Sequence, residues 1–332
     1  MVTRVQGCPD QFIIPAVPEK IMTLSLRKRL WLLLTLYAFG QFSALAQTCQ
    51  QNTIVNVRDQ KGKLVPGLQP ASFQATLHGQ PVKIHGDRVK TESPRVVLLI
   101  DVSGSVNREN HNLELAQYAA GNFITVSAIP HVALVQFADR ILDTLGFDAR
   151  PEEMLQKLAD LDDGRRATAV FDSLMYAASL FDTPRDGDAV YLISDGVDNR
   201  SKFRRKDLEQ KFLSSGVRLF CFILSNSNRP HSESEAARDD LQHLAEVTGG
   251  SIANVNRNES ANVRERLNAA LSRTYDTMKN FYQLEVEFPS NADTRRQWEL
   301  QVVDEQGKKR KNVEVTYARN LTRCTPEPPQ KK

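Results

Sequence analysis

A short apolar run that ends in a cluster of oxygen-bearing residues constrains this chain more than any other feature. Residues 95–100 (RVVLLI) are too few for a typical helix and rich in β-branched side chains, so they predict a strand buried on both faces, as in a parallel sheet. The next five residues read DVSGS. In an extended turn, alternate side chains point the same way, so Asp101, Ser103 and Ser105 can converge on one point, and the intervening glycine permits the tight backbone path.

The chemistry of these three side chains indicates a site for a hard cation. One carboxylate and two hydroxyls suit Mg²⁺, Mn²⁺ or Ca²⁺, whereas zinc prefers His and Cys. Two further oxygen donors lie downstream. Thr168 stands where a new helical pattern begins, and Asp195 follows the apolar strand pattern of residues 189–193. If strands and helices alternate, both can join the first cluster.

The order D-x-S-x-S, then a Thr that opens a helix, then a strand-terminal Asp-Gly resembles the metal-ion-dependent adhesion site of von Willebrand factor type A domains. The resemblance implies that Ser103, Ser105 and Thr168 coordinate a divalent metal directly or through water. It also implies that Asp101 and Asp195 supply charge through direct or water-mediated contact. The expected cofactor is Mg²⁺, with Mn²⁺ or Ca²⁺ as alternatives.

The middle of the chain, residues 93–279, alternates strand and helix patterns. Such alternation predicts an α/β fold with a doubly wound, mostly parallel central sheet and helices on both faces, a Rossmann-like arrangement. Residues 132–137 continue the sheet, and residues 141–145 suit an antiparallel edge strand. Ligands of such sheets bind outside the carboxyl ends of the strands where the strand order reverses. The resemblance places the strands that end at Asp101 and Asp195 side by side at that point.

The two flanks of this domain show the period-two alternation of short strands. Residues 47–92 and 280–320 each carry several such runs with glycine-centred turns, and each is too thin to bury a core alone. We therefore expect both flanks to join as one small β-sandwich-like domain. Residues 321–332 are expected to form a disordered tail.

The first 46 residues indicate an export signal. Residues 22–46 hold a basic stretch, an apolar run and a small-residue cleavage site that ends at Ala46, so translation is expected to start at Met22 and the mature protein to be secreted or periplasmic. An uncleaved anchor is the alternative, although the apolar run is only about half of the ~20 residues that span a bilayer. Lipidation at Cys49 is a weaker one, because the residues before it do not resemble a lipobox.

The cysteines fit an oxidising compartment. Cys49 and Cys324 lie at opposite ends of the mature chain and can form a disulfide if the termini meet, but spacing alone does not establish the pairing. Cys221 lies within the apolar run 219–224 and reads as a buried strand thiol.

The metal site predicts a binding device whose partner is acidic. Neutral hydroxyls leave the ion electrophilic and with an open position, which a Glu or Asp of a partner protein can complete. Asp172 and Asp198 are expected to cap a helix or to form supporting hydrogen bonds rather than to ligate. We expect a rim of basic residues around the metal, formed by Arg108, Arg165, Arg166, Arg200, Lys202 and Arg204. The alternative is that these residues only form a solvated charged surface.

Other functional classes find little support. With 43 basic and 40 acidic residues the net charge is +3, too small to indicate nucleic acid. The motifs H-E-x-x-H, G-x-S-x-G and G-x-x-x-x-G-K-[ST] are absent from the sequence, so a metal-dependent hydrolase is the weaker alternative. A nucleotide is not expected, because Asp101 would repel a pyrophosphate. A structural subunit whose metal only stabilises the fold is the main alternative, and its partner binding would survive chelation.

The turn at residues 58–68, followed by Phe73, resembles the flank of exported bacterial von Willebrand factor type A related proteins first described in acidobacteria. The carboxyl-terminal part lacks the R-K-G-Y ending of that pattern. The resemblance implies an exported, non-enzymatic adhesion or protein-binding module and names no partner.

Overall fold

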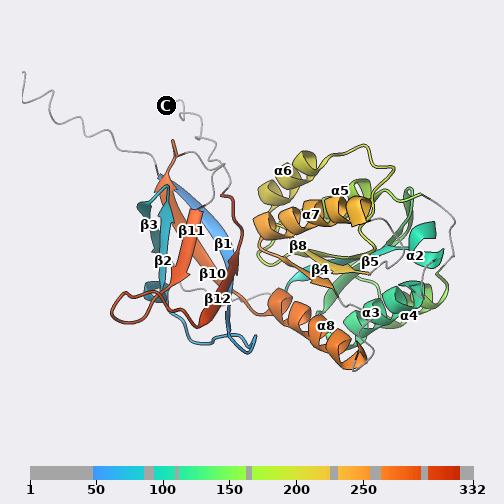
Figure 1. Ribbon diagram of the computed structural model, residues 1–332, viewed down its shortest axis with the longest axis horizontal. Coiled ribbons are helices and arrows are strands. Elements are labelled where there is room, and N and C mark those ends of the chain that lie inside the picture. Colours follow the sequence, from blue (N-terminus) through green and yellow to red (C-terminus); the bar gives the residue numbers. More distant parts are fainter. Residues whose placement is uncertain are drawn as a thin grey trace, which may run out of the picture. The chain divides into compact units, whose positions relative to one another are not determined.

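The computed structural model describes residues 48–85, 93–108, 112–161, 167–224, 231–254, 263–292 and 298–321 (Figure 1). The chain divides into two units, Met1–Ala46 and Gln47–Lys332. The first unit, with the predicted export signal and Met22, lies outside the described residues. The described residues of the second unit form two sheets of six strands each.

Three neighbouring strands in the middle of the central sheet are buried at every position. β4 (Arg95–Asp101) is buried at every position, as residues 95–100 predict. It pairs in parallel with β5 (His131–Phe137) on one side and with β7 (Ala189–Ser194) on the other. β8 (Arg218–Ile223) and β9 (Ser251–Asn254) continue the parallel pairing beyond β7, and β6 (Ile141–Leu145) closes the opposite edge antiparallel to β5, as predicted.

Helices cover both faces of this sheet because its strands have two apolar faces to bury (Figure 1). Side chains of α3, α4 and α8 pack with one face, and those of α5, α6 and α7 pack with the other. The doubly wound α/β fold expected from the sequence is thus observed. The helices are α2 (Gly104–Arg108), α3 (Asn112–Val126), α4 (Pro151–Ala159), α5 (Val170–Ser179), α6 (Arg205–Ser215), α7 (His231–Thr248) and α8 (Val263–Lys279).

The second sheet draws three strands from each flank of the chain and is entirely antiparallel. Its strand order is β11-β2-β3-β10-β1-β12, and a short 3-10 helix, η1 (Pro70–Ser72), precedes β2. The end strands β11 and β12 lie against each other, so the sheet nearly closes on itself. The bounds are β1 (Thr48–Asp59), β2 (Phe73–Leu77), β3 (Gln80–His85), β10 (Tyr282–Pro289), β11 (Trp298–Val302) and β12 (Val313–Tyr317).

This arrangement differs from the expected β-sandwich in having one wrapped sheet instead of two sheets packed face to face. Alternation of apolar and polar residues marks which face of each strand is buried, but it is the same for a sandwich and for a closed sheet. The core of the sheet collects the inward side chains of all six strands, with Trp298 and Phe288 among the largest.

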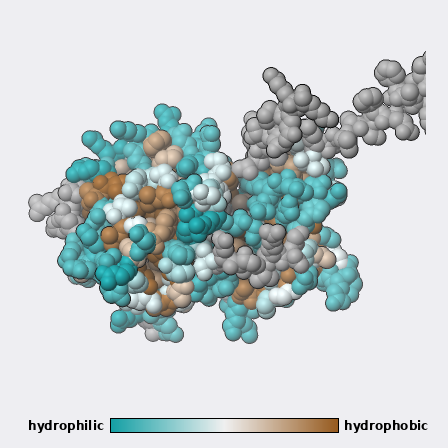
Figure 2. Space-filling view, turned by 180° about the vertical axis from the view of Figure 1, so that it is seen from behind, coloured by the Kyte–Doolittle hydropathy of each residue, from teal (hydrophilic) through white to brown (hydrophobic). Residues whose placement is uncertain are grey.

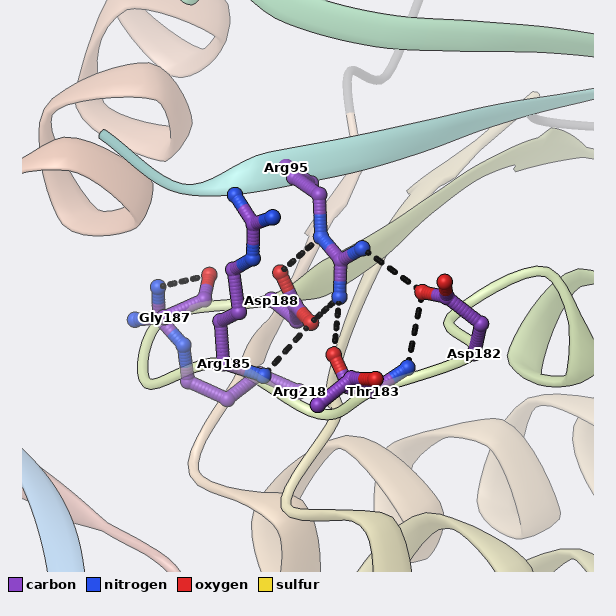
Figure 3. Close-up of polar contacts among 7 residues, drawn as sticks. All are labelled: Arg95, Asp182, Thr183, Arg185, Gly187, Asp188 and Arg218. Atoms are coloured by element: carbon purple, nitrogen blue, oxygen red, sulfur yellow. Dashed lines mark hydrogen bonds and ion pairs between the residues drawn. The ribbon is translucent and has the colours of Figure 1, made fainter. Parts of the chain in front are cut away.

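The amino ends of the central strands hold a buried ion cluster (Figure 3). Arg95, at the start of β4, donates two hydrogen bonds to Asp188: Nε to Oδ1 at 3.1 Å and Nη2 to Oδ2 at 2.6 Å. Its Nη1 pairs with Asp182 Oδ1 at 3.1 Å and its Nη2 bonds the Thr183 carbonyl. Arg218, at the start of β8, is also buried. The cluster ties the loop before β7 to the strands.

The cysteines agree with the sequence-based expectations where they are described. Cys221 lies in β8, fully buried and reduced, and burial raises the pKa of its thiol. Cys49 takes part in a disulfide bond. Cys324 lies outside the described residues, so its pairing with Cys49 stays a prediction. No helix within the described ranges is both long and apolar enough to span a membrane.

Candidate metal site

The strand order brings two acidic strand ends together. From β4 the chain moves outward through β5 to β6 and then returns to β7 on the other side of β4. The order therefore reverses between β4 and β7, which run in parallel with Ile100 opposite Ile193. Asp101 ends β4 and Asp195 directly follows β7, so both carboxylates lie at the carboxyl edge of the sheet where ligands of such folds bind.

Asp101 is a fully buried carboxylate whose hydrogen bonds come from neutral groups. The Ser103 N–H donates to its Oδ1 at 2.8 Å, and the Ser194 hydroxyl donates to its Oδ2 at 2.6 Å. Burial, and next the negative charge of Asp195, raise the pKa of Asp101 to about 7. An ionised Asp101 is therefore unfavourable unless a cation lies beside it.

The two serines of the pentapeptide converge as their spacing predicts. Ser103 Oγ and Ser105 Oγ are 3.0 Å apart, Ser103 is buried, and Ser105 lies in the first turn of α2, partly exposed. The Val102 N–H bonds the Phe137 carbonyl of β5 at 2.9 Å, which holds the start of this loop against the neighbouring strand. The hydroxyl pair is thus anchored to the sheet beneath it.

Thr168 is held at the same edge by the loop that follows β7. Its backbone N–H donates to Asn199 Oδ1 at 2.9 Å, and the Asn199 N–H donates back to the Thr168 carbonyl at 3.1 Å. Thr168 is buried and precedes α5 by two residues, as a Thr that opens a helix should. The clamp ties Thr168 to the segment that carries Asp195.

Asp172 and Asp198 organise this segment by hydrogen bonding, as predicted. Asp198 Oδ2 accepts from the Phe171 N–H in the first turn of α5 at 2.9 Å, and its Oδ1 accepts from two N–H groups of its own loop. Asp172 Oδ1 accepts from the N–H groups of Lys202 and Phe203 at 2.8 and 3.0 Å. The loop therefore presents its side chains from a fixed backbone.

The exposed side of this loop is basic and carries one aromatic ring. Arg200, Lys202 and Arg204 are exposed, and none of them forms an ion pair with another described residue. Phe203 is 45% exposed. The remaining predicted rim residues are not placed: Arg165 and Arg166 lie outside the described residues, and Arg108 is described only by its backbone at the end of α2.

Residues 96–197, which run from β4 to the loop after Asp195, match the family model of the von Willebrand factor type A domain. The chain contains a von Willebrand factor type A domain. Domains of this family in general mediate protein interactions rather than catalysis. No curated protein matches the chain.

Three solved structures show the resemblance, each at low sequence identity. An aerotolerance-related membrane protein from Bacteroides fragilis is 18% identical over 54% of this chain and 99% of its own, with a TM-score of 0.39. The hypothetical protein BatB from Bacteroides thetaiotaomicron is 15% identical over 55% and 98%, with a TM-score of 0.40. A von Willebrand factor type A protein from Catenulispora acidiphila is 14% identical over 82% and 73%, with a TM-score of 0.45.

The donor set of the type A domain fits a hard divalent cation. Two carboxylates and three hydroxyls offer only oxygen, which Mg²⁺, Mn²⁺ and Ca²⁺ accept. The described residues contain no group of three or more His, Cys, Asp or Glu side chains that could hold a metal ion, so no described cluster suits zinc. Asp101, Ser103, Ser105, Thr168 and Asp195 would hold the ion, which would supply positive charge and an open coordination position.

Two residues of the site escape sequence reasoning. Ser194 is the last residue of a strand buried at every position, so no alternation marks its hydroxyl as turned toward Asp101. Asn199 lies 31 residues after Thr168, and only the folded chain reveals the clamp. The adjacency of Ser194 to Asp195 is the one local signal that could have identified the first of them.

Proposed function

We propose that the type A domain binds Mg²⁺, or alternatively Mn²⁺ or Ca²⁺, and uses the ion to capture an Asp or Glu side chain of a partner protein. The observation that carries this proposal is the environment of Asp101. It is fully buried, close enough to Asp195 for that charge to raise its pKa, and bonded only by neutral donors. A divalent cation at this position would relieve the repulsion between the carboxylates.

Capture follows from the charge of the donor set. Two carboxylates formally neutralise the charge of a divalent ion. If one of the carboxylates contacts the ion through a water molecule, however, the ion still attracts a further anion. Three hydroxyl ligands add no charge. A partner carboxylate is therefore the group that such a site attracts best, and water is the weaker competitor.

The loop beside the site supports an acidic partner. Arg200, Lys202 and Arg204 are exposed and project from a backbone that Asp172 and Asp198 hold in place. Unpaired cations near a docking site accelerate encounter with an acidic surface and disfavour basic ones. Phe203 adds an apolar contact between Lys202 and Arg204.

We further propose that the protein acts outside the cytoplasm, as one of the exported bacterial proteins that its flank resembles. The disulfide of Cys49 supports an oxidising compartment. The signal-like residues 22–46 lie outside the described residues and support the proposal through their sequence alone.

The test is a calorimetric titration of Mg²⁺ into the wild-type protein and the Asp101→Ala variant, followed by binding to a peptide array in Mg²⁺ or in EDTA. The array pairs each Asp or Glu peptide with its Asn or Gln counterpart. We expect saturable Mg²⁺ binding that the substitution abolishes, and Mg²⁺-dependent retention of the carboxylate peptides only. Asp160→Ala, which removes an exposed carboxylate at the end of α4, is the matched control and should behave like the wild type.

Two outcomes contradict the proposal. If wild-type protein and Asp101→Ala bind Mg²⁺ equally, the site is elsewhere. If Mg²⁺ binds at this site but peptide retention is the same in EDTA, the metal only stabilises the fold and the protein is a structural subunit.

A further inference from the structure

The segment that leads from the metal site into α6 gathers cations around one aromatic ring. Residues 198–207 read DNRSKFRRKD, with five cations against two carboxylates. Figure 1 shows the segment as an arch on the outside of the domain, between the carboxyl edge of the central sheet and α6. Residues 200–206 are called the basic loop below. Four of its cations are exposed: Arg200, Lys202, Arg204 and Lys206.

These four cations have no ion-pair partner among the described residues. Only Arg205, the fifth cation of the basic loop, has a counterion, because its Nη1 lies 2.6 Å from Asp240 Oδ1. The neighbouring carboxylates accept hydrogen bonds from the backbone instead. Asp207 Oδ2 accepts from the Arg204 N–H at 2.8 Å, and Asp172 accepts from two further N–H groups of the loop. The positive charge is therefore available to a ligand from outside.

The aromatic ring of the basic loop is held at the surface. Phe203 is 45% exposed, and its N–H donates to Asp172 Oδ1 at 3.0 Å, which fixes the backbone that carries the ring. An apolar ring left in water forgoes the free energy that burial provides. The other strongly exposed apolar side chains differ: Val126, at the end of α3, has no Lys or Arg within five residues of it in the sequence.

Cations and ring together match the interface of an anionic bilayer. Clusters of Lys and Arg are attracted to anionic headgroups, and each cation near the surface adds to the attraction. An apolar side chain among them can enter the boundary between headgroups and acyl chains. An acidic protein surface satisfies the cations alone, whereas the bilayer interface satisfies the cations and the ring.

We propose that the basic loop docks the protein on an anionic phospholipid bilayer. Its exposed cations lie among the headgroup phosphates, and Phe203 enters the acyl boundary. The inference goes beyond metal-dependent capture and does not rest on it, because these side chains are exposed whether or not an ion is bound. Asp195 precedes the basic loop by five residues, so docking places the metal site close to the membrane surface.

The test measures sedimentation of the chain from Gln47 to Lys332, one unit of the structure, with phospholipid vesicles in EDTA. Chelation removes cations that bridge carboxylates to phosphates. The vesicles contain phosphatidylcholine mixed with phosphatidylglycerol, or phosphatidylcholine alone. We expect binding to the anionic vesicles only, and weaker binding as salt is added. Lys202→Glu/Arg204→Glu should bind at least about thirtyfold more weakly. Phe203→Ser should bind about tenfold more weakly.

A tryptophan at the tip of the loop reports whether the ring leaves water. Trp298 is buried and is the only other tryptophan from Gln47 onward, so an emission change in the Phe203→Trp variant comes from the basic loop. We expect a blue shift with anionic vesicles and quenching by lipids with brominated acyl chains. The same vesicles without phosphatidylglycerol should leave the emission unchanged.

Two matched controls separate the basic loop from general adsorption. Lys308→Glu/Lys311→Glu makes the same change in net charge on exposed residues between β11 and β12, and Val126→Ser removes an exposed apolar side chain of α3. Both variants should bind vesicles like the wild type. Every measurement is made in EDTA, so its failure leaves metal-dependent capture to be decided by the Mg²⁺ titration.

Four outcomes overturn the inference. The first is absence of binding to anionic vesicles, and the second is an equal loss of binding in the Lys308/Lys311 control. The third is binding without a change in the emission of the Phe203→Trp variant, which would mean adsorption by charge without entry of the ring. The fourth is retention of a polyglutamate peptide by the basic loop without binding to vesicles, which would assign the loop to an acidic protein partner.

Discussion

The two ends of the central sheet differ in whether a buried carboxylate has a cation as its partner. At the amino end, Arg95 meets Asp188 through two hydrogen bonds, so a buried carboxylate and a buried cation neutralise each other. At the carboxyl end, Asp101 is equally buried, but its partners are a hydroxyl and a backbone N–H. The comparison teaches that burial alone does not mark a functional carboxylate. A buried carboxylate with its own buried cation stabilises the fold, whereas one without such a cation is a candidate for binding a cation from solution.

Arg218 is a second buried cation at the amino end of the sheet, and its hydrogen-bond partners also belong to the protein. Its guanidinium bonds the Thr277 and Met278 carbonyls at the end of α8, and also the Gly187 carbonyl. A cation at a helix carboxyl terminus is favoured by the helix dipole. Burial lowers the pKa of Arg218 to about 9, so the side chain remains charged at neutral pH. It stacks near Phe220 and Phe281.

Exposed apolar side chains are unevenly distributed over the surface of the protein. Hydrophobic residues gather in patches among hydrophilic ones in the space-filling view (Figure 2). Among the described residues, only three large apolar side chains are strongly exposed: Val126, Leu155 and Phe203. Phe203 is the one in the loop that follows Asp195, so an exposed apolar side chain and exposed cations lie together in the loop beside the proposed metal site.

The largest expected effect is a loss of stability when the ion pair at the amino end of the sheet is removed. Asp188→Ala leaves the buried Arg95 without its main counterion and should lower the free energy of unfolding by about 3–5 kcal/mol. Urea unfolding measures the loss. Asp182→Ala removes the other carboxylate bonded to Arg95, but that side chain is 84% exposed, so it should cost no more than about 1 kcal/mol. Equal losses for the two variants would show that burial does not set the value of these pairs.

A smaller effect distinguishes the carboxyl end by its pH dependence. In EDTA, Asp101 should stabilise the fold below its unfolded pKa of 3.8, and this contribution should be lost as the pH rises through its folded pKa of about 7. The native state holds a proton that the unfolded chain has already released, so stability falls over this range, by the order of 2–4 kcal/mol.

Saturating Mg²⁺ should abolish that fall, because the cation favours the ionised carboxylate. Urea midpoints at about pH 5 and about pH 8, with EDTA or Mg²⁺, measure the effect. Asp101→Asn is the control that subtracts the titration of all other groups, and it should lack both the fall and the gain from Mg²⁺. A wild-type protein that Mg²⁺ stabilises equally at both pH values would argue against Asp101 as the responsive group.

The smallest effect concerns the clamp on Thr168. Asn199→Ala removes the hydrogen bond to the Thr168 N–H and should weaken Mg²⁺ binding about tenfold, because a residue that positions a ligand affects affinity without touching the metal. Calorimetry gives the affinity, and the urea midpoint should change little. Asn199→Asp keeps the acceptor and should retain most of the affinity. Unchanged binding in the alanine variant would mean that the backbone alone positions Thr168.

The sequence predicts the central fold well because its signals are local. An apolar run of strand length, ended by a polar pentapeptide, marks β4 and its loop without knowledge of any neighbour. The antiparallel edge strand β6 and the buried thiol of Cys221 follow from the same kind of pattern. The hydrogen-bonding role of Asp198 was predicted in kind, but the Phe171 N–H that it accepts from lies 27 residues earlier in the chain, so the fold decides which helix it caps.

What only the tertiary structure decided depends on pairs of residues far apart in the chain. Ser194 reaches Asp101 across two adjacent strands, and Asn199 holds Thr168 across a helix and a strand. Likewise, the alternating flanks determined that strands form, while the pairing order decided that they make one nearly closed sheet in which β11 and β12 lie against each other. Local patterns specify which face of an element is buried. Which groups then meet across that buried face is settled by the packing of the whole chain.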